Sequence, residues 1–291
     1  MMNFLAVTWN VDPVMLNLWG FKIMWYGLCW MIALGGGAFF FKNFIDREKL
    51  DPRLLDRAFW WGVIATMVGA RLGHCLFYDP VHYLTHPIEL LYIRQGGMAS
   101  HGAAVGLLLG LWAFSKRSKL PYIWVLDRVM IPVTVGGAVV RFGNLLNSEI
   151  YGHATELPWG FIFVRAGETV PKHPTQIYEA LCYLATFAVL LFLYYRKNMG
   201  ARRPGLMFGV GLLGVFLSRF LLEFIKNPQI AAEETMLINI GQILSLPFII
   251  AGIVMIIWPY TKRKLTPDPN RWAGLKEYKD PHKPKSKTPK K

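Results

Sequence analysis

Two long stretches of this sequence contain no charged residue, and they constrain the fold more than any other feature. Residues 23–41 and 236–258 lack Lys, Arg, Asp and Glu altogether. Each is long enough to cross a bilayer as a helix, which takes about 20 residues. The chain is 54% hydrophobic and 17% charged, whereas soluble domains are roughly 45–50% apolar and about 25% charged. The composition therefore argues against a water-soluble protein.

The apolar stretches predict an all-α fold, a polytopic membrane bundle of about seven transmembrane helices. The predicted spans cover residues 18–41, 58–78, 98–115, 122–141, 175–195, 205–225 and 238–260. Backbone groups in hydrocarbon must be satisfied within the segment, so helices are expected there. Closely spaced glycines such as Gly102, Gly106 and Gly110 favour tight helix contacts. We expect a single membrane domain, residues 1–260, with a segment outside the membrane at about 142–173.

The distribution of basic residues predicts the orientation of these spans. Segments 42–57, 115–120 and 196–203 hold five, three and four Lys or Arg, and the tail, residues 261–291, holds eleven. Short cytoplasmic loops carry the excess of Lys and Arg. The tail is therefore expected in the cytoplasm, and seven spans then place the N-terminus in the periplasm.

The basic tail also explains most of the net charge. Its eleven basic and three acidic residues contribute +8 of the formal net charge of +14. It is rich in Pro and Lys, so we expect it to be disordered and to face anionic lipid. Nucleic acid is therefore not an expected partner.

No motif in the sequence indicates a metal ion or an organic cofactor. Cys29, Cys75 and Cys182 lie far apart inside apolar segments. This spacing fits neither a disulfide framework nor a metal site. We expect the cysteines to be packing residues and the protein to need no cofactor.

Ionisable residues near the outer ends of the predicted spans are the candidate functional groups: His101, Arg141, Glu149, Arg219 and Glu223. A Lys or Arg at a helix centre costs about 2.5–3.5 kcal/mol on insertion scales, so intramembrane charges indicate function by default. Arg219 and Glu223 are four residues apart and can pair on one helix face. Asp127 and Arg128, at the opposite end, are interpreted as structural or interfacial, and Arg71 fits either role.

The densest polar cluster runs from Arg141 to Gly152, directly after an apolar span, and includes Asn144, Asn147 and Glu149. Arginine presents a planar fork of donors suited to phosphate, and Asn binds hydroxyl or carbonyl oxygens. The cluster therefore predicts a site for a lipid headgroup. His101 stands at a glycine-bracketed entry to a span, where small neighbours allow a substrate to approach closely.

At this point the motifs identify a family. They are Trp25-Tyr26-Gly27, Gly97-Met98 with His101-Gly102, the segment from Arg141 to Gly152, His173-Pro174-Thr175-Gln176-Ile177-Tyr178-Glu179, Arg219 to Phe224, and Gly241-Gln242-Ile243-Leu244-Ser245. In this order they make the chain resemble the bacterial phosphatidylglycerol–prolipoprotein diacylglyceryl transferases over nearly its whole length. The resemblance implies a multi-pass enzyme of the bacterial inner membrane with its active site toward the periplasm.

The resemblance also implies the reaction. The diacylglyceryl group of phosphatidylglycerol is transferred to the lipobox cysteine of a prolipoprotein, and glycerol 1-phosphate is released. His101 is then the candidate base for the thiol, because the unperturbed pKa of histidine lies near 6.5. Arg141 and Arg219 would stabilise the leaving phosphate. An alternative is that Glu149, or the phosphate polarised by an arginine, accepts the proton.

The remaining site residues receive supporting roles. Glu149 and Glu223 are assigned to holding Arg141 and Arg219. Headgroup contacts are assigned to Tyr26, Asn144, Asn147 and Gly152.

The main competing interpretation is a lipid or small-molecule transporter or flippase, since intramembrane charges also mark transport paths. A transporter predicts polar residues spread across the membrane depth, whereas here they gather at the outer side. A serine protease is disfavoured because no G-x-S-x-G elbow is present. A CDP-alcohol type transferase would need an Asp-rich metal motif, which the sequence lacks.

Overall fold

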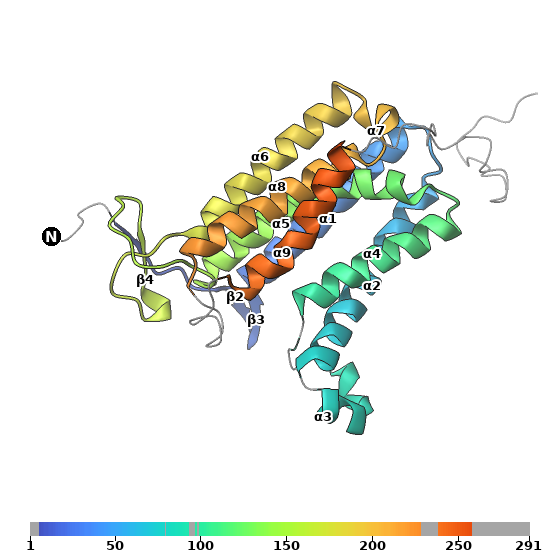
Figure 1. Ribbon diagram of the computed structural model, residues 1–291. Helices are drawn as coiled ribbons and strands as arrows, with labels where there is room; N and C mark the ends of the chain where they lie inside the picture. Colours follow the sequence, from blue (N-terminus) through green and yellow to red (C-terminus); the bar gives the residue numbers. More distant parts are fainter. Residues whose placement is uncertain (1–5, 79, 93–96, 98, 228–237, 258–291) are drawn as a thin grey trace, which may run out of the picture. The chain divides into compact units, whose positions relative to one another are not determined.

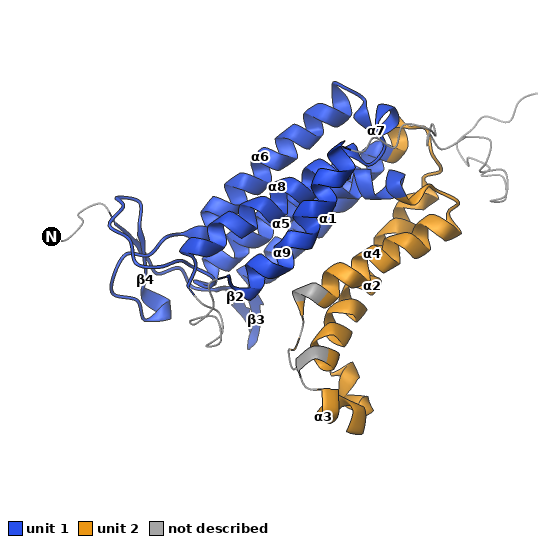
Figure 2. Cartoon of the chain, in the orientation of Figure 1, with its two compact units in different colours: residues 1–44, 123–265 blue, residues 45–122, 266–291 orange. Residues whose placement is uncertain are grey.

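The protein is mostly helical and divides into two compact units. The structure is a computed structural model that describes residues 6–78, 80–92, 97, 99–227 and 238–257 (Figure 1). One unit comprises residues 1–44 and 123–265, and the other comprises residues 45–122 and 266–291 (Figure 2). All the polar residues from Arg141 to Glu223 that the sequence singled out belong to the first unit.

The first unit is a helical bundle built around one buried helix. Its helices are α1 (Trp25–Arg47), α5 (Tyr122–Leu146), α6 (Thr175–Tyr195), the short α7 (Met199–Arg202), α8 (Leu206–Leu222) and α9 (Ile240–Ile257), with single 3-10 turns η3 (Val164–Ala166) and η4 (Glu223–Ile225). The most apolar window of α5 is 61% buried, against 22–28% in α1, α6, α8 and α9. Helix α5 is therefore the centre of this unit, and Arg141 lies five residues before its end.

Small residues let the helices of the first unit approach closely. A Cβ atom added to Gly209 of α8 would lie 3.0 Å from the carbonyl oxygen of Gly252 in α9. A Cβ atom added to Gly214 of α8 would lie 2.6 Å from Cγ2 of Thr186 in α6. Helix α8 therefore packs between α6 and α9, which brings its C-terminal end, with Arg219, to the same bundle as Arg141.

Four short strands lie in the first unit, and the expectation of an all-helical fold did not include them. Strand β1 (Val7–Trp9) pairs in parallel with β4 (Phe161–Phe163), and β2 (Val14–Leu18) forms a hairpin with β3 (Phe21–Met24). Residues 18–24, which the sequence analysis counted in the predicted span 18–41, belong to the β2–β3 hairpin, and the helix there begins at Trp25. The Trp9 indole Nε1 donates to the Leu145 carbonyl at 2.9 Å, so the β1–β4 pair is fastened to the end of α5.

The second unit is a helix pair with two short turns: α2 (Arg53–Tyr78), α3 (Pro80–Thr85), η1 (Pro87–Leu91) and α4 (Ser100–Arg117). Its two long helices touch through glycine. A Cβ atom on Gly69 would lie 2.6 Å from Cα of Gly106, and one on Gly73 would lie 2.6 Å from Cα of Gly102. The predicted close packing at Gly102 and Gly106 is therefore confirmed.

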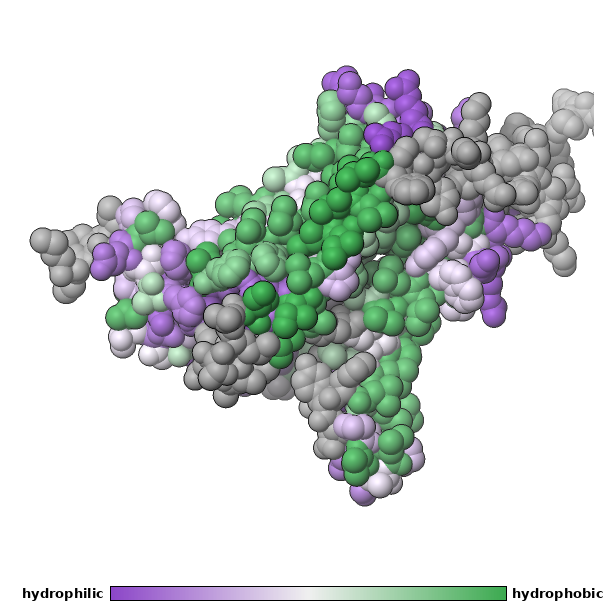
Figure 3. All heavy atoms as spheres, viewed as in Figure 1, coloured by the Kyte–Doolittle hydropathy of each residue, from purple (hydrophilic) through white to green (hydrophobic). Residues whose placement is uncertain are grey.

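The helices agree with the predicted spans to different degrees. Helices occupy all seven predicted positions, and five helical segments in the described residues are long and apolar enough to cross a membrane: Trp25–Arg47, Tyr122–Leu146, Thr175–Tyr195, Leu206–Ile225 and Ile240–Ile257. On the face shown in Figure 3, apolar side chains gather over the long helices. The other two predicted spans correspond to α2 and α4, which fall outside that set. A multi-pass membrane protein is thus confirmed, while the number seven stays a prediction.

Candidate active site

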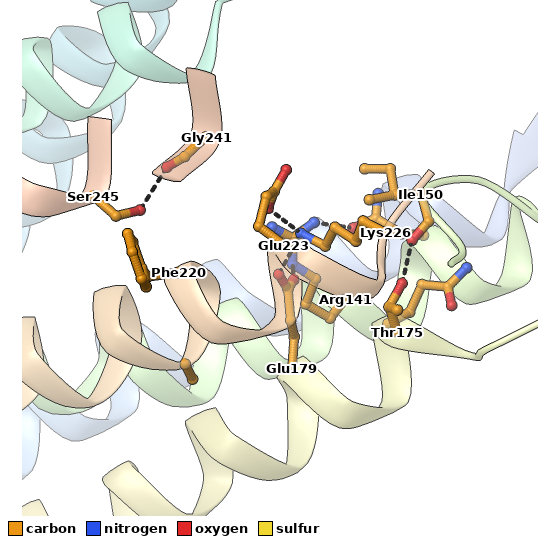
Figure 4. Close-up of polar contacts among 12 residues, drawn as sticks. Arg141, Ile150, Thr175, Glu179, Phe220, Glu223, Lys226, Gly241 and Ser245 are labelled. Atoms are coloured by element: carbon orange, nitrogen blue, oxygen red, sulfur yellow. Dashed lines mark hydrogen bonds and ion pairs between the residues drawn. The ribbon is translucent and has the colours of Figure 1, made fainter. Parts of the chain in front are cut away.

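Arg141 forms an ion pair with a carboxylate that comes from a different helix. Its guanidinium Nε contacts Oε2 of Glu179, which lies in the second turn of α6 (Figure 4). The Glu179 side chain is 1% exposed and that of Arg141 is 14% exposed. Two full charges are therefore removed from solvent at the end of α5, which is costly unless each is compensated.

Lys226 supplies the second cation of this cluster. Its Nζ lies 2.6 Å from Oε1 of Glu179 and 3.0 Å from Oε2 of Glu223, and its side chain is 1% exposed. Arg141, Glu179, Lys226 and Glu223 thus form a chain of alternating charges (Figure 4). The sequence analysis missed Lys226 as a site residue, although its spacing of three from Glu223 was a usable signal.

The predicted pairing of Arg219 with Glu223 is wrong. Glu223 pairs instead with Lys226, three residues further on. The Glu223 N–H still donates to the Arg219 carbonyl, so the four-residue spacing is that of an α-helix and the two side chains start on one face. The Glu223 carboxylate nevertheless pairs with the ammonium of Lys226. A Cβ atom on Gly241 would lie 2.8 Å from Oε1 of Glu223, which shows that the carboxylate is also packed against the start of α9.

Arg219 remains as an additional positive charge near the cluster. Its charge acts on Glu179 and Tyr183, yet among the described residues it makes neither a hydrogen bond nor an ion pair. The cluster contains three cations, Arg141, Arg219 and Lys226, and the two carboxylates of Glu179 and Glu223. These five groups together carry one net positive charge, which favours the binding of an anion.

The polar segment after Arg141 is linked to it through Asn144. Arg141 Nη1 donates to Asn144 Oδ1 at 3.1 Å, and Asn144 Nδ2 donates to Glu149 Oε1 at 2.7 Å. Glu149 therefore reaches Arg141 through the amide and not by a direct ion pair. The Asn147 amide lies 3.5 Å from the same carboxylate oxygen, and its own Oδ1 is buried with no hydrogen-bond partner among the described residues.

The backbone of residues 148–152 is clamped in an unusual conformation. Ser148 and Ile150 have φ values of +54° and +60°, which non-glycine residues seldom adopt. Two side chains at the start of α6 hold the segment: Thr175 Oγ1 donates to the Ile150 carbonyl at 2.8 Å, and Gln176 Nε2 donates to the Glu149 carbonyl at 2.7 Å. The His173-Pro-Thr-Gln motif therefore shapes the segment that carries Glu149.

Gly152 has a packing role in this clamp. It forms an isolated antiparallel bridge with Lys226, and a Cβ atom there would lie 2.8 Å from Cβ of His173. The close approach leaves room only for glycine. The predicted contact of Gly152 with substrate stays a prediction.

Two tyrosines complete the surroundings of Arg141. Tyr183, one turn after Glu179 on α6, is hydrogen bonded to the Arg141 guanidinium and is buried. Tyr26, the second residue of α1, packs near the end of α5, since a Cβ atom on Gly143 would lie 2.9 Å from its ring. The sequence analysis proposed Tyr26 but missed Tyr183, whose four-residue spacing from Glu179 places both on one helix face.

Two residues of the segment between α5 and α6, Tyr151 and His173, favour their neutral forms near neutral pH. Burial and the hydrogen bond to Glu168 at 2.9 Å raise the pKa of Tyr151 to about 12. Burial, followed by the charge of His153, lowers the pKa of His173. The positive character of this end of the unit therefore comes from its Arg and Lys side chains.

His101 is the second residue of α4, in the second unit, and its side chain lies outside the described part of the structure. Its predicted place beside Arg141 stays a prediction. The chain leading to it is held by Arg71 of α2, which is 5% exposed. Arg71 donates to the carbonyls of Glu89, Leu90 and Gly97 at 2.6, 3.0 and 3.2 Å. Arg71 is thus a structural residue at the entry to α4.

Asp127 and Arg128 are structural, as the sequence suggested. The buried Asp127 carboxylate accepts from the backbone N–H groups of Gly205 and Phe208 at 2.7 and 2.9 Å. It therefore caps the first turn of α8, whose N–H groups have no partner within the helix. The Arg128 guanidinium lies 4.4 Å from the centre of the Trp124 ring, a cation–π contact.

Comparison with known proteins shows which family the chain belongs to. A sequence model of the family described as prolipoprotein diacylglyceryl transferase matches residues 13–258. The chain belongs to this family. It is 45% identical over 267 residues to the phosphatidylglycerol–prolipoprotein diacylglyceryl transferase of Porphyromonas gingivalis, covering 86% of this chain and 94% of that one.

Other bacterial relatives carry the same description. The transferase of Tolumonas auensis is 40% identical over 250 residues, which cover 86% of this chain and 96% of the relative. That of Bacteroides fragilis is 36% identical over 272 residues, covering 89% and 97%. All the long helices of both units and the segment from Arg141 to Lys226 therefore lie within the matched region, whereas strand β1 precedes it.

Proposed function

We propose that this protein transfers the diacylglyceryl group of phosphatidylglycerol to the lipobox cysteine of prolipoproteins and releases glycerol 1-phosphate. The observation that supports it most is the buried cluster of Arg141, Glu179, Lys226 and Glu223 with Arg219 beside it. Its excess positive charge suits the phosphate of an anionic phospholipid. The family membership supplies the reaction.

Arg141 retains donors for a phosphate after its protein contacts are satisfied. A guanidinium has five N–H donors. Among the described residues its partners are Glu179, Asn144 and Tyr183, which leaves two N–H groups. Lys226 binds the other oxygen of Glu179, so the single negative charge of this carboxylate faces two cations. Glu179 therefore offsets the charge of Arg141 only in part, and positive potential remains for the phosphate of the substrate.

The chemical step is a displacement at the glycerol carbon that bears the phosphate. The cysteine sulfur forms the new C–S bond while the C–O bond to phosphate breaks, and the electron pair goes to the leaving phosphate oxygen. The thiol proton passes to a base, for which His101 is the candidate, since a free thiol with a pKa near 8.5 is only a few per cent ionised at neutral pH. Arg141 and Arg219 stabilise the charge that develops on the phosphate.

The polar groups next to Arg141 fit the rest of the headgroup. The buried Asn147 Oδ1 has no partner among the described residues and can accept from a glycerol hydroxyl. Asn144 links Arg141 to Glu149 and keeps both side chains oriented. Tyr26 borders the same end of α5.

The proposed setting is the bacterial inner membrane, crossed seven times. Basic segments precede α5 and follow α6, which places those helix ends in the cytoplasm by the positive-inside rule. Arg141, at the other end of α5, then faces the periplasm, and the C-terminal tail is cytoplasmic. Prolipoprotein signal peptides reach the site from that side.

A direct test incubates the purified protein with phosphatidylglycerol vesicles and a synthetic lipobox peptide. We expect the peptide mass to rise by one diacylglyceryl unit and glycerol phosphate to appear in equal amount. A peptide with Ser in place of Cys should stay unmodified, and His101→Asn should abolish transfer. Phospholipid movement between leaflets without any modified peptide would overturn the proposal.

A further inference from the structure

The β2–β3 hairpin is a separate feature of the first unit that the transfer reaction does not use. Its strands pair Leu16 with Ile23, Asn17 with Lys22 and Leu18 with Phe21. Trp19 and Gly20 form the connection, with φ values of +48° and +89°. Two central residues with positive φ make a type I′ turn, whose twist matches that of a two-residue hairpin.

The hairpin has one apolar and one polar face. Side chains alternate along a strand, so the Leu16–Ile23 and Leu18–Phe21 pairs share one face and the Asn17–Lys22 pair occupies the other. The apolar side chains are open to the surroundings: Leu16 is 49%, Leu18 48%, Phe21 73% and Trp19 101% exposed. The described parts of the chain therefore leave this face uncovered.

An isolated two-stranded hairpin with such a face is at best marginally stable in water. An apolar patch bordered by polar residues marks a binding surface. The position of the hairpin indicates what covers it. Strand β3 ends at Met24 and α1, a candidate membrane span, begins at Trp25, so the hairpin must lie at the bilayer surface.

The side chains fit the boundary between headgroups and acyl chains. Tryptophan is enriched at membrane interfaces, and here it stands at the tip. A lysine can extend its stem along apolar surface while its ammonium reaches the phosphates, and Lys22 lies on the polar face. An amphipathic surface of this type lies in the plane of the interface with its apolar face a few ångströms deep.

We propose that the β2–β3 hairpin inserts Leu16, Leu18, Trp19 and Phe21 into the lipid leaflet at the start of α1, with Asn17 and Lys22 toward the phosphates. The hairpin thereby sets the depth of the Tyr26–Arg141 end of the unit, since Tyr26 follows β3 by two residues. The partner is the bilayer itself. This inference rests on the membrane topology and is independent of the transfer chemistry.

Depth-dependent fluorescence quenching tests the insertion. Single-cysteine proteins carry Leu18→Cys or, as the matched control on the adjacent residue, Asn17→Cys, with Cys29, Cys75 and Cys182 replaced by Ala. An environment-sensitive label is attached, and the protein is reconstituted in vesicles of phosphatidylcholine and phosphatidylglycerol. We expect blue-shifted emission at position 18, quenched more strongly by a nitroxide at the fifth acyl carbon than by one on the headgroup. Position 17 should show the reverse order.

Water-like emission at position 18 without quenching by the acyl nitroxide, or the same depth at both positions, would overturn the proposal. Because depth is measured without substrate turnover, this result is distinct from a failure of the transferase assay. A second measurement uses unlabelled Trp19→Ser/Phe21→Ser protein. It should show a several-fold higher KM for phosphatidylglycerol in vesicles at unchanged kcat, whereas Asn17→Ser should leave both constants unchanged. An unchanged KM in the double variant would show that the hairpin does not set the depth.

Discussion

Replacing Lys226 with Met should strongly destabilise the first unit, because it leaves two buried carboxylates with one cation between them. The Lys226 Nζ lies 2.6 and 3.0 Å from Glu179 and Glu223, and all three side chains are at most 4% exposed. At an effective dielectric constant of 20, each attraction is on the order of 4 kcal/mol or more. Most of this offsets desolvation, so the expected net loss is about 3–5 kcal/mol of unfolding free energy.

The same reasoning predicts rescue by a second change. In Lys226→Met/Glu223→Gln protein, the ion pair of Arg141 with Glu179 remains, Arg219 keeps its charge beside it, and no carboxylate has lost its cation. The double variant should therefore be more stable than the sum of the two single variants predicts, by at least about 1 kcal/mol. Lys172→Met is the matched control, since Lys172 pairs with Glu168 at 3.0 Å in a less buried position and should cost at most about 1 kcal/mol.

The measurement is a double-variant cycle of unfolding free energies, obtained by denaturant titration of the protein in mild detergent and followed by circular dichroism. Transfer activity is recorded on the folded fraction. If the losses from the two single variants add to within about 0.5 kcal/mol, the charges are not energetically coupled. The argued role of Lys226 in compensating Glu223 would then be refuted.

Three further predictions concern other parts of the molecule. Arg219→Gln should lower kcat about 10²- to 10³-fold with little change in thermal stability. The control Arg165→Gln, at an exposed pair with Asp12, should change neither kcat nor stability. An Arg219→Gln protein that fails to fold would contradict the prediction. Asp127→Ala should cost about 1–3 kcal/mol of stability by uncapping α8, measured by denaturant titration, with activity per folded molecule retained. Arg71→Gln should accelerate hydrogen exchange in the segment up to Gly97 and reduce kcat, whereas unchanged exchange would refute its role at the entry to α4.

The sequence could predict those parts of the site that depend on local spacing. Arg141, Asn144 and Glu149 lie within nine residues, so a single turn and loop suffice to bring them together. Glu179 is the last residue of one of the family motifs, but the motif alone does not say which side chain it meets. Its contact with Arg141 depends on how α5 and α6 pack, and no local pattern records that geometry.

Other errors came from treating a spacing that permits a contact as evidence that the contact forms. Arg219 and Glu223 have the spacing of an α-helical pair, and the Glu223 N–H donates to the Arg219 carbonyl, yet the Glu223 carboxylate pairs with Lys226. The spacing does not choose between two basic partners. The short strands were missed for another reason, since hydropathy does not distinguish a strand from a helix: residues 21–24, counted in the predicted span 18–41, form β3.

The glycine contacts between α2 and α4 have a mechanical consequence. Where the backbones of Gly69 and Gly106, and of Gly73 and Gly102, nearly touch, no side chain is available to act as a flexible spacer. The two helices are therefore expected to move as one rigid body, so that a displacement of α4, which carries His101, displaces α2 with it.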